Sequence, residues 1–268
     1  MEWKGNAPYA LCITHDVDRI TKQWYHYIFY GCRHPRIQMN SLKRKLYGIE
    51  PYWNFGKLIE LEKSIGVRST FFFLNESHRE MSPNFWGRYK ITEERVAEII
   101  KRLDGDGFEI GLHGSFYSYK DIRLLKKEKD ILEKILGHKI VSVRQHHLNY
   151  DKEMTGKIHK SLDLKYDSTK GYSDRVEKGQ PYRTIEGIIE IPISLMDTVH
   201  LTKDTYKQCL EIEEQGGILV LNFHQCHFNE TEYQSYVDFY SRILYKAVKD
   251  GAWIATMKEV GDWLDGRI

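Results

Sequence analysis

The chain has 268 residues, of which 41% are hydrophobic and 29% charged, and its formal net charge at pH 7 is +2. This length fits one large α/β domain or two small ones, and so small a net charge gives no basic field that would favour nucleic acid as a partner. No stretch is apolar for long enough to span a membrane, and no long apolar segment precedes Asp16 as a signal peptide would require. The four cysteines are scattered without a CxxC pair, so we expect free thiols and a cytoplasmic protein.

The hydropathy pattern alternates short apolar runs with longer segments of helical periodicity. The short runs predict strands at 9–13, 69–74, 109–112, 141–144, 164–167, 188–191, 218–223 and 253–256. The longer segments predict helices at 53–65, 92–105, 119–136, 152–162, 203–214 and 230–250. Thr92 is expected to cap the second of these helices, and Gly137 and Gly251 stand where helices should end. About eight strand–helix alternations without a linker predict one α/β barrel over residues 1–268 rather than two domains.

A long insertion at about residues 19–52 separates the first predicted strand from its helix, and it is rich in aromatic residues. Insertions of this kind at the C-terminal face of a barrel build lids and substrate walls. The aromatic rings of the insertion could stack on sugar faces. We favour the other interpretation, in which the rings pack the insertion onto the barrel.

Two aspartates, Asp16 and Asp18, follow the first apolar run directly. Side chains two residues apart on an extended backbone point the same way, so both carboxylates face one space. Two carboxylates at such a short distance repel each other unless a cation lies between them or one of them takes a proton. The pair therefore predicts a metal site or an acid–base pair. The alternative is that one aspartate caps the next helix and the other is solvated.

Later predicted strands also end in polar side chains. His113 follows the third strand, Arg144 and His146 lie at the end of the fourth, Asp167 ends the fifth, and His224 follows the seventh. Strand ends at one rim of a barrel converge on a single site, and together these residue types indicate a metal-assisted hydrolase.

Two further histidines have a structural interpretation. His15 lies between the two aspartates and should point away from them, which favours packing in the core. His227 and its neighbour Cys226 are not matched by a second Cys/His pair, so no structural zinc is expected there.

The order of these motifs resembles the polysaccharide deacetylases, the NodB-homology or carbohydrate esterase family 4 enzymes, from Thr14 to His224. The resemblance implies a distorted (β/α)7-8 barrel that binds a divalent metal, usually zinc. It implies that Asp16 is the general base and that Asp18 and His113 bind the metal. It also implies that Arg144 holds the base and that His224 is the general acid.

One position departs from that family, whose second motif carries another histidine four residues after the first. Here that position is Tyr117, and a phenol with a pKa near 10 is a poor zinc ligand. His146 shares a face with Arg144 on an extended segment, whereas His147 would turn away, so His146 is the preferred replacement ligand. Tyr117 and Asp167, which falls where the family has an active-site wall acid, are expected to contact the substrate.

The expected activity is metal-dependent removal of an acetyl group, most often N-acetyl, from a carbohydrate. Residues 166–172, with Pro192 and Met196-Asp197, further resemble a branch linked to O-antigen or surface polysaccharide gene clusters. Nickel or cobalt could replace zinc, because a mixed ligand set does not select one metal. Two alternatives stay open. One is an O-acetyl or other amide hydrolase on the same fold, and the other is a non-catalytic carbohydrate-binding barrel that has lost its metal. The sequence does not indicate an oligomeric state.

Overall fold

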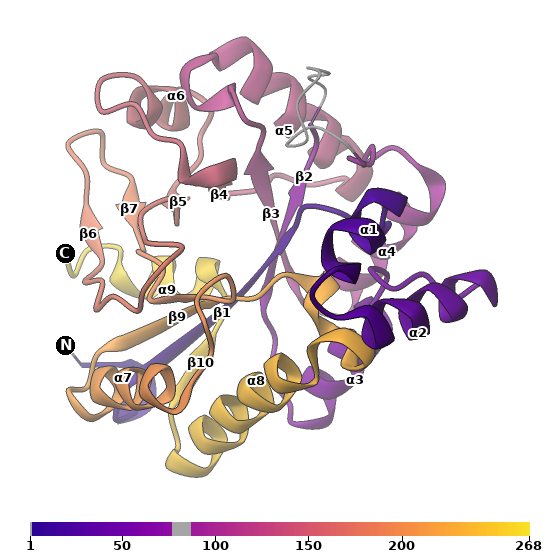
Figure 1. Ribbon diagram of the computed structural model, residues 1–268. Coiled ribbons are helices and arrows are strands. Elements are labelled where there is room, and N and C mark those ends of the chain that lie inside the picture. The colour runs from indigo at the N-terminus through magenta and orange to yellow at the C-terminus, as the bar shows by residue number, and fades with distance from the viewer. Residues whose placement is uncertain (1, 77–86) are drawn as a thin grey trace.

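The computed structural model describes residues 2–76 and 87–268. Figure 1 shows a sheet that curls around the centre of the molecule, with helices on its outer side. The strands are β1 (Ala10–Val17), β2 (Thr70–Leu74), β3 (Glu109–Gly114), β4 (Ser142–Gln145), β5 (Tyr166–Asp167), β6 (Tyr182–Arg183), β7 (Ile189–Glu190), β8 (Leu195–Met196), β9 (Ile218–Asn222) and β10 (Trp253–Ala255).

The described α-helices do not all lie on one side of this sheet: most cover its outer face, the last packs into the apolar cluster on its inner face, and the first two project from the barrel (Figure 1). They are α1 (Trp24–Gly31), α2 (Pro35–Leu46), α3 (Phe55–Ser64), α4 (Glu94–Gly105), α5 (Ile122–Leu136), α6 (Thr155–Ser161), α7 (Lys203–Glu214), α8 (Glu230–Asp250) and α9 (Met257–Leu264). Short 3₁₀ turns are η1 (Lys4–Asn6), η3 (Ser118–Lys120), η4 (His146–Leu148) and η5 (Gln225–Phe228). No described helix is both long and apolar enough to cross a membrane.

The strand order is β6-β7-β5-β4-β3-β2-β1-β9-β8, and among the described strands only β6 runs antiparallel to its neighbour. Strand β1 is the centre of the curl. Its first half pairs with β10 and its second half with β2, while β9 runs along its other side. Parallel strands place their carboxyl ends at the same edge, so β1, β3, β4 and β9 all end at one mouth. The predicted distorted (β/α) barrel is confirmed.

Side chains alternate across β1, and the alternation divides the core in two. Leu11 and Ile13 face outward into a large apolar cluster with the helices, whereas Ala10 and Cys12 face inward. The inward face continues through Thr14 to Asp16, which leads from apolar packing to the polar mouth of the barrel. His15 faces outward and is buried, as the sequence predicts, with its ring nitrogens bonded to Phe223 O and Glu62 Oε1.

All eight predicted strands and all six predicted helices are present, within a few residues at their ends. The helices that end at Gly137 and Gly251 do so with φ of 83° and 71°, a left-handed conformation that glycine adopts without strain. The sequence pattern missed the two-residue strands β6 and β8 and the helices α1, α2 and α9. The prediction that Thr92 caps a helix was wrong. Helix α4 begins after Glu93, whose carboxylate accepts a hydrogen bond from Lys90 N and closes a turn there.

Candidate active site

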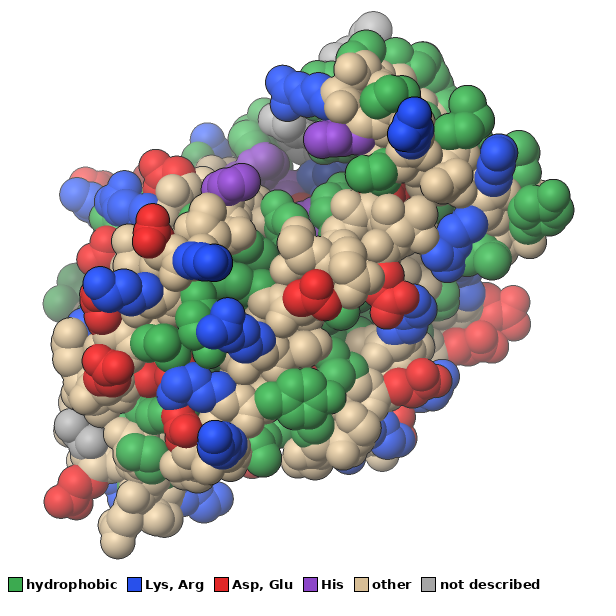
Figure 2. All heavy atoms as spheres, turned by 60° about the horizontal axis from the view of Figure 1, so that its bottom comes forward, with side chains coloured by type: hydrophobic (Ala, Val, Ile, Leu, Met, Phe, Trp, Pro, Cys, Tyr) green, Lys and Arg blue, Asp and Glu red, His purple; other side chains and the backbone are tan. Residues whose placement is uncertain are grey.

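The carboxyl ends of the central strands enclose a cavity of about 210 Å³. Figure 2 shows histidine side chains gathered around a hollow in the upper part of the molecule. The residues that line the cavity are Asp16, Asp18, His113, His146, His147, Leu148, Ser173, Met196, Thr198 and His224. Side chains far apart in the sequence, predicted from strand ends, therefore share one cavity.

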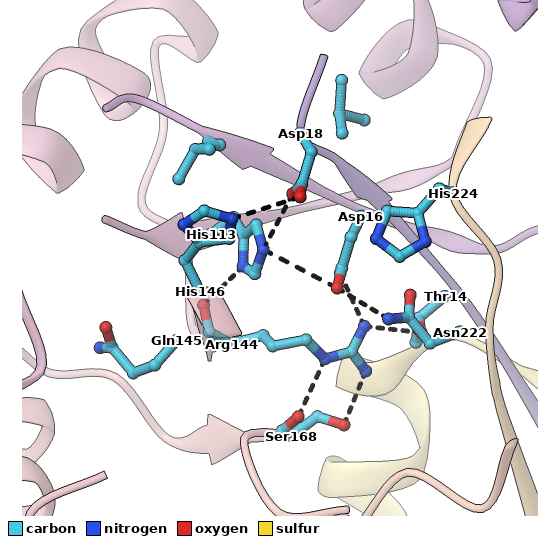
Figure 3. A network of polar contacts seen from close by, with 12 residues as sticks. Thr14, Asp16, Asp18, His113, Arg144, Gln145, His146, Ser168, Asn222 and His224 are labelled. Carbon is cyan, nitrogen blue, oxygen red and sulfur yellow. Dashed lines mark hydrogen bonds and ion pairs between the residues drawn. The ribbon is translucent and has the colours of Figure 1, made fainter. Parts of the chain in front are cut away.

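Asp18, His113 and His146 point their polar atoms at one another (Figure 3). His113 Nε2 lies 3.3 Å from Asp18 Oδ1, and His146 Nε2 lies 3.2 Å from Asp18 Oδ2. One donor atom from each residue lies within 4.8 Å of the other two, a spacing at which all three could ligate one ion. Two imidazoles and one carboxylate are a common ligand set for divalent transition metals.

The hydrogen bonds around this trio fit a cation. His113 Nδ1 lies 2.9 Å from Arg144 O, and because a carbonyl only accepts, Nδ1 carries the proton. In the neutral ring Nε2 then presents a lone pair to the Asp18 carboxylate, an arrangement that needs a positive charge between them. Asp18 Oδ1 is buried and accepts no hydrogen bond within the described chain. The trio therefore suits a divalent metal.

The pKa values of Asp18 and His146 agree with ligands that are free of protons. Burial alone would raise the pKa of Asp18, but His146, His113 and Arg88 outweigh it and hold that pKa well below its usual range. Burial lowers the pKa of His146 to about 4, against the attraction of Asp18, so the ring is neutral near pH 7. An ionised carboxylate and a neutral imidazole, as found for Asp18 and His146, are the forms that bind metals.

Arg88 also reaches this trio, and no motif in the sequence pointed to it. Its Nη1 donates a hydrogen bond of 3.0 Å to Asp18 O, and its Nη2 lies 3.1 Å from His146 Nε2. The guanidinium comes from the loop before α4, where no periodic pattern or spacing relates it to the strand ends. Its position adds a fixed positive charge beside the carboxylate of Asp18.

Asp16 lies deeper, with both of its carboxylate oxygens held by buried donors (Figure 3). Arg144 Nη1 donates to Asp16 Oδ1 over 2.8 Å, and Asn222 Nδ2 donates to Oδ2 over 2.7 Å. Arg144 is itself fixed by Ser168, whose carbonyl and hydroxyl oxygens accept from Nε and Nη2. Burial raises the pKa of Asp16, but Arg144 and the nearby histidines outweigh burial and lower it. Asp16 is therefore an oriented, ionised carboxylate.

His224 faces the cavity from the end of β9 and is held from behind by Asp197. His224 Nδ1 lies 2.6 Å from Asp197 Oδ1, and the backbone N–H of His224 donates to Oδ2 over 2.7 Å. Burial disfavours the charged ring, yet the charge and hydrogen bond of Asp197 outweigh it and raise the pKa of His224 to about 10. His227 Nδ1 lies 2.6 Å from Asp197 Oδ2. Protons on the two rings and the backbone therefore satisfy this carboxylate without a metal.

Two residues expected to contact the substrate lie elsewhere. Asp167 is buried outside the cavity, where its carboxylate meets His159 Nδ1 at 3.1 Å, because Ser168 takes the inward position of that strand end. Tyr117 lines a separate surface pocket beside Lys120, since the chain turns away from the mouth after Gly114. Neither residue lines the cavity that holds Asp16 and Asp18, so the geometry does not support a substrate contact by them.

Comparisons with known proteins identify the family. A family model described as "WbmS-like: Polysaccharide deacetylase" matches residues 91–240, more than half of the chain. The chain belongs to this family. Membership confirms the predicted resemblance to polysaccharide deacetylases and makes the protein a carbohydrate deacetylase, a hydrolase of carbon–nitrogen bonds other than peptide bonds. A search among curated proteins found no match.

Solved structures share the fold at low sequence identity. A protein from Mycobacterium smegmatis described as a polysaccharide deacetylase is 19% identical, with a TM-score of 0.66, and the alignment covers 100% of this chain and 93% of that one. A PuuE allantoinase is 12% identical, with a TM-score of 0.64 over 99% and 93% of the two chains. A protein from Pseudomonas aeruginosa PAO1 described as a polysaccharide deacetylase is 15% identical, with a TM-score of 0.62 over 98% and 93%. These structures confirm the barrel fold of this WbmS-like deacetylase.

Proposed function

We propose that this WbmS-like deacetylase removes an N-acetyl group from a sugar of a surface polysaccharide or its precursor, and that it does so with a bound divalent metal. The observation that carries the proposal is the shared cavity in which Asp18, His113 and His146 lie beside the oriented carboxylate of Asp16. In the proposed reaction, water adds to the acetyl carbonyl carbon and the carbon–nitrogen bond breaks. The products are acetate and a free amine on the sugar.

Asp18, His113 and His146 are the proposed metal ligands. When bound, a zinc ion would lower the pKa of a water molecule and stabilise negative charge on the acetyl carbonyl oxygen. Zinc is the proposed ion because two imidazoles and one carboxylate suit it, and the same donors also accept cobalt or nickel. The family motif has a second histidine ligand at the position where this chain has Tyr117. We propose that His146 supplies the ligand that Tyr117 does not.

Asp16 is the proposed general base. Its pKa is lowered, so it is ionised near pH 7 and can accept a proton from the attacking water. Arg144 and Asn222 each bond a different oxygen of the carboxylate, which fixes its plane relative to the cavity. Arg144 is therefore a positioning residue that acts through Asp16.

His224 is the proposed general acid. With a pKa raised to about 10, its ring is protonated near pH 7. Asp197 accepts the hydrogen bond from Nδ1, which leaves the proton on Nε2 for the leaving nitrogen. Asp16 and His224 thus hold opposite protonation states in one cavity, as the base and the acid of an amide hydrolysis require.

The proposal also covers the setting of the enzyme. The four cysteines are free, and three of them are buried, which supports a reducing cytoplasmic location. A substrate assembled inside the cell, before a surface polysaccharide is exported, would match that location. We further propose that residues 1–268 act as one barrel domain, which is supported by a single sheet with β1 at its centre.

Acetate release from an N-acetylated oligosaccharide by the zinc-loaded enzyme tests this proposal. Asp16→Asn is expected to reduce turnover by roughly 10²–10⁴-fold, because it removes the base. The variant should keep the fold and bind zinc as the wild type does, since Asp16 is not a proposed ligand. Asp18→Asn is the matched comparison, and it should lose both turnover and zinc.

Unchanged turnover in Asp16→Asn would remove Asp16 from the mechanism. Release of acetate from an O-acetylated sugar, with none from the N-acetylated one, would identify an esterase instead. Full activity after complete removal of the metal by a chelator would refute the metal-dependent reaction.

A further inference from the structure

The segment between β1 and Glu50 has an unusual charge pattern. Residues 19–49 contain seven lysines and arginines and no aspartate or glutamate, in a chain that has 38 acidic residues in all. Helices α1 and α2 form most of this segment and project at the right of Figure 1. The insertion therefore differs in charge from the rest of the nearly neutral molecule.

Polar side chains attach α2 to α8. Lys22 Nζ is buried and donates to Gln38 Oε1 and to Glu232 Oε2, both at 2.5 Å. Gln38 Nε2 also donates to Glu232 Oε2 over 3.1 Å, and Ser41 donates to the other oxygen of that carboxylate. The face of α2 toward the barrel is thus held by hydrogen bonds around Glu232 rather than by apolar packing.

The outward side of the same segment is apolar. Helix α1 has the sequence WYHYIFYG, yet none of its residues is buried, and Trp24 is 71% exposed. Leu46 at the end of α2 is 78% exposed and Tyr47 is 86% exposed. Large side chains of this kind normally enter a core, and several of them together in solvent mark a binding surface.

Exposed cations lie among these apolar side chains. Arg33, Arg36 and Lys43 are exposed, and none of them forms an ion pair with the described residues. Met39, Lys43 and Leu46 are four and three residues apart on α2 and therefore share one helical face. Figure 2 shows hydrophobic and basic side chains together at the upper right, where the molecule projects.

We propose that this face, formed by residues 24–49, binds the surface of a membrane that carries anionic lipids. Trp24, Phe29 and Leu46 would enter the boundary between headgroups and acyl chains, while Arg33, Arg36 and Lys43 would meet the negative headgroups. A second copy of this chain is the poorer occupant, because two acid-free basic faces would repel each other. The proposal concerns peripheral attachment and does not depend on which sugar the enzyme deacetylates.

The position of the face relative to the cavity gives the attachment a consequence. A pocket of about 300 Å³ lies between the two helices and α8, and Tyr233 and Tyr236 form part of its wall. The rings of these tyrosines pack against His227 at centroid distances of 4.5 and 5.3 Å. His227 shares Asp197 with His224. Attachment by α1 and α2 would therefore hold the active site near the membrane surface.

Co-sedimentation of the full-length protein with vesicles tests the proposal. Vesicles of equal parts phosphatidylcholine and phosphatidylglycerol should bind the wild type, and vesicles of phosphatidylcholine alone should bind it at least about tenfold more weakly. The double variant Trp24→Ser with Leu46→Ser, and the double variant Arg33→Glu with Lys43→Glu, should each lower binding by about tenfold or more. All four positions are exposed, so the variants should keep the fold and their deacetylase activity on a water-soluble substrate.

Matched controls change exposed residues elsewhere. Ile185→Ser removes an apolar side chain that is 98% exposed, and Lys127→Glu reverses an exposed charge on α5, so both should bind as the wild type does. Failure of the wild type to bind anionic vesicles would overturn the proposal, as would equal losses in the controls. Dimerisation that the two double variants abolish, without any vesicle binding, would show instead that the face joins two copies of the chain.

Discussion

Asp197 is the residue that sets the charge of His224, because its carboxylate accepts from the ring and the backbone of that histidine. The pKa of His224, raised to about 10, means that the ring stays protonated up to the alkaline range and loses its proton above it. If His224 is the acid, kcat/KM should fall as pH rises through that value. The acid form, and with it the activity, is present on the low-pH side.

The first prediction follows from this pair. Asp197→Asn removes the negative charge, so burial will dominate and lower the pKa of His224. The alkaline fall of kcat/KM should then move down by more than about one pH unit. His227→Gln keeps the contact between Asp197 and His224 and serves as the control. An unmoved alkaline limb in Asp197→Asn would contradict the role of His224 as acid.

The position of a residue could be predicted from the sequence where the strand pattern fixed the direction of its side chain. Asp16, Asp18 and His113 could be located because alternation and parallel pairing fix where a strand end points. Arg88 could not, since it lies in the irregular chain before α4, and Asp197 could not because β8, which ends one residue before it, was not predicted. Alternation along β5 turns Asp167 away from the cavity and Ser168 toward it, and Tyr117 follows β3 in irregular chain where alternation gives no direction.

At the scale of elements, helix α5 fixes the turn that follows His113. Ser115 N donates to Glu128 Oε2 over 3.1 Å, and Ser115 Oγ donates to Oε1 over 2.5 Å. Burial raises the pKa of Glu128 from 4.5 to about 8, even though both hydrogen bonds from Ser115 act to lower it. The carboxyl group is therefore protonated in the folded protein across a range in which the unfolded chain has lost that proton.

The second prediction concerns stability against pH. Between pH 4.5 and 8 the folded state binds more protons at Glu128 than the unfolded state does, so the free energy of unfolding falls as pH rises. Glu128→Gln resembles the protonated acid and lacks this dependence. The free energy of unfolding can be measured with urea at pH 5 and pH 8 for both proteins. From pH 5 to pH 8, the stability of the variant relative to the wild type should rise by more than about 1 kcal/mol. Parallel stability curves would show that Glu128 is ionised in the fold.

Helices α1 and α2 illustrate what periodicity does not reveal. The sequence indicated an aromatic insertion whose rings pack on the barrel, but Trp24 and Tyr47 are largely exposed and α1 contains no buried residue. The apolar pattern of a helix normally predicts burial in the core. Here the inward contacts of α2 are polar, around Glu232, and in α1 the rings of Tyr25, Tyr27 and Tyr30 are partly buried while those of Trp24 and Phe29 are exposed.

At the scale of the molecule, the barrel could be predicted because eight of its strands coincide with short apolar runs and six of its helices with segments of helical periodicity. The way the sheet curls was not readable, because β1 pairs with β10 along one half and with β2 along the other. That pairing lets β1, β3 and β4 end at the same mouth, so residues separated by more than 100 positions meet there. The function therefore depends on the closure of the sheet as a whole.

Cobalt binding tests the central claim most directly, because Co²⁺ in a site of nitrogen and oxygen ligands absorbs visible light. Titration of metal-free protein should give about one bound Co²⁺ per chain in the wild type, with an affinity at least about tenfold lower in His146→Ala. His147→Ala, at the neighbouring exposed position, should bind as the wild type does. Equal cobalt affinity and an equal spectrum in His146→Ala and the wild type would contradict a site built from Asp18, His113 and His146.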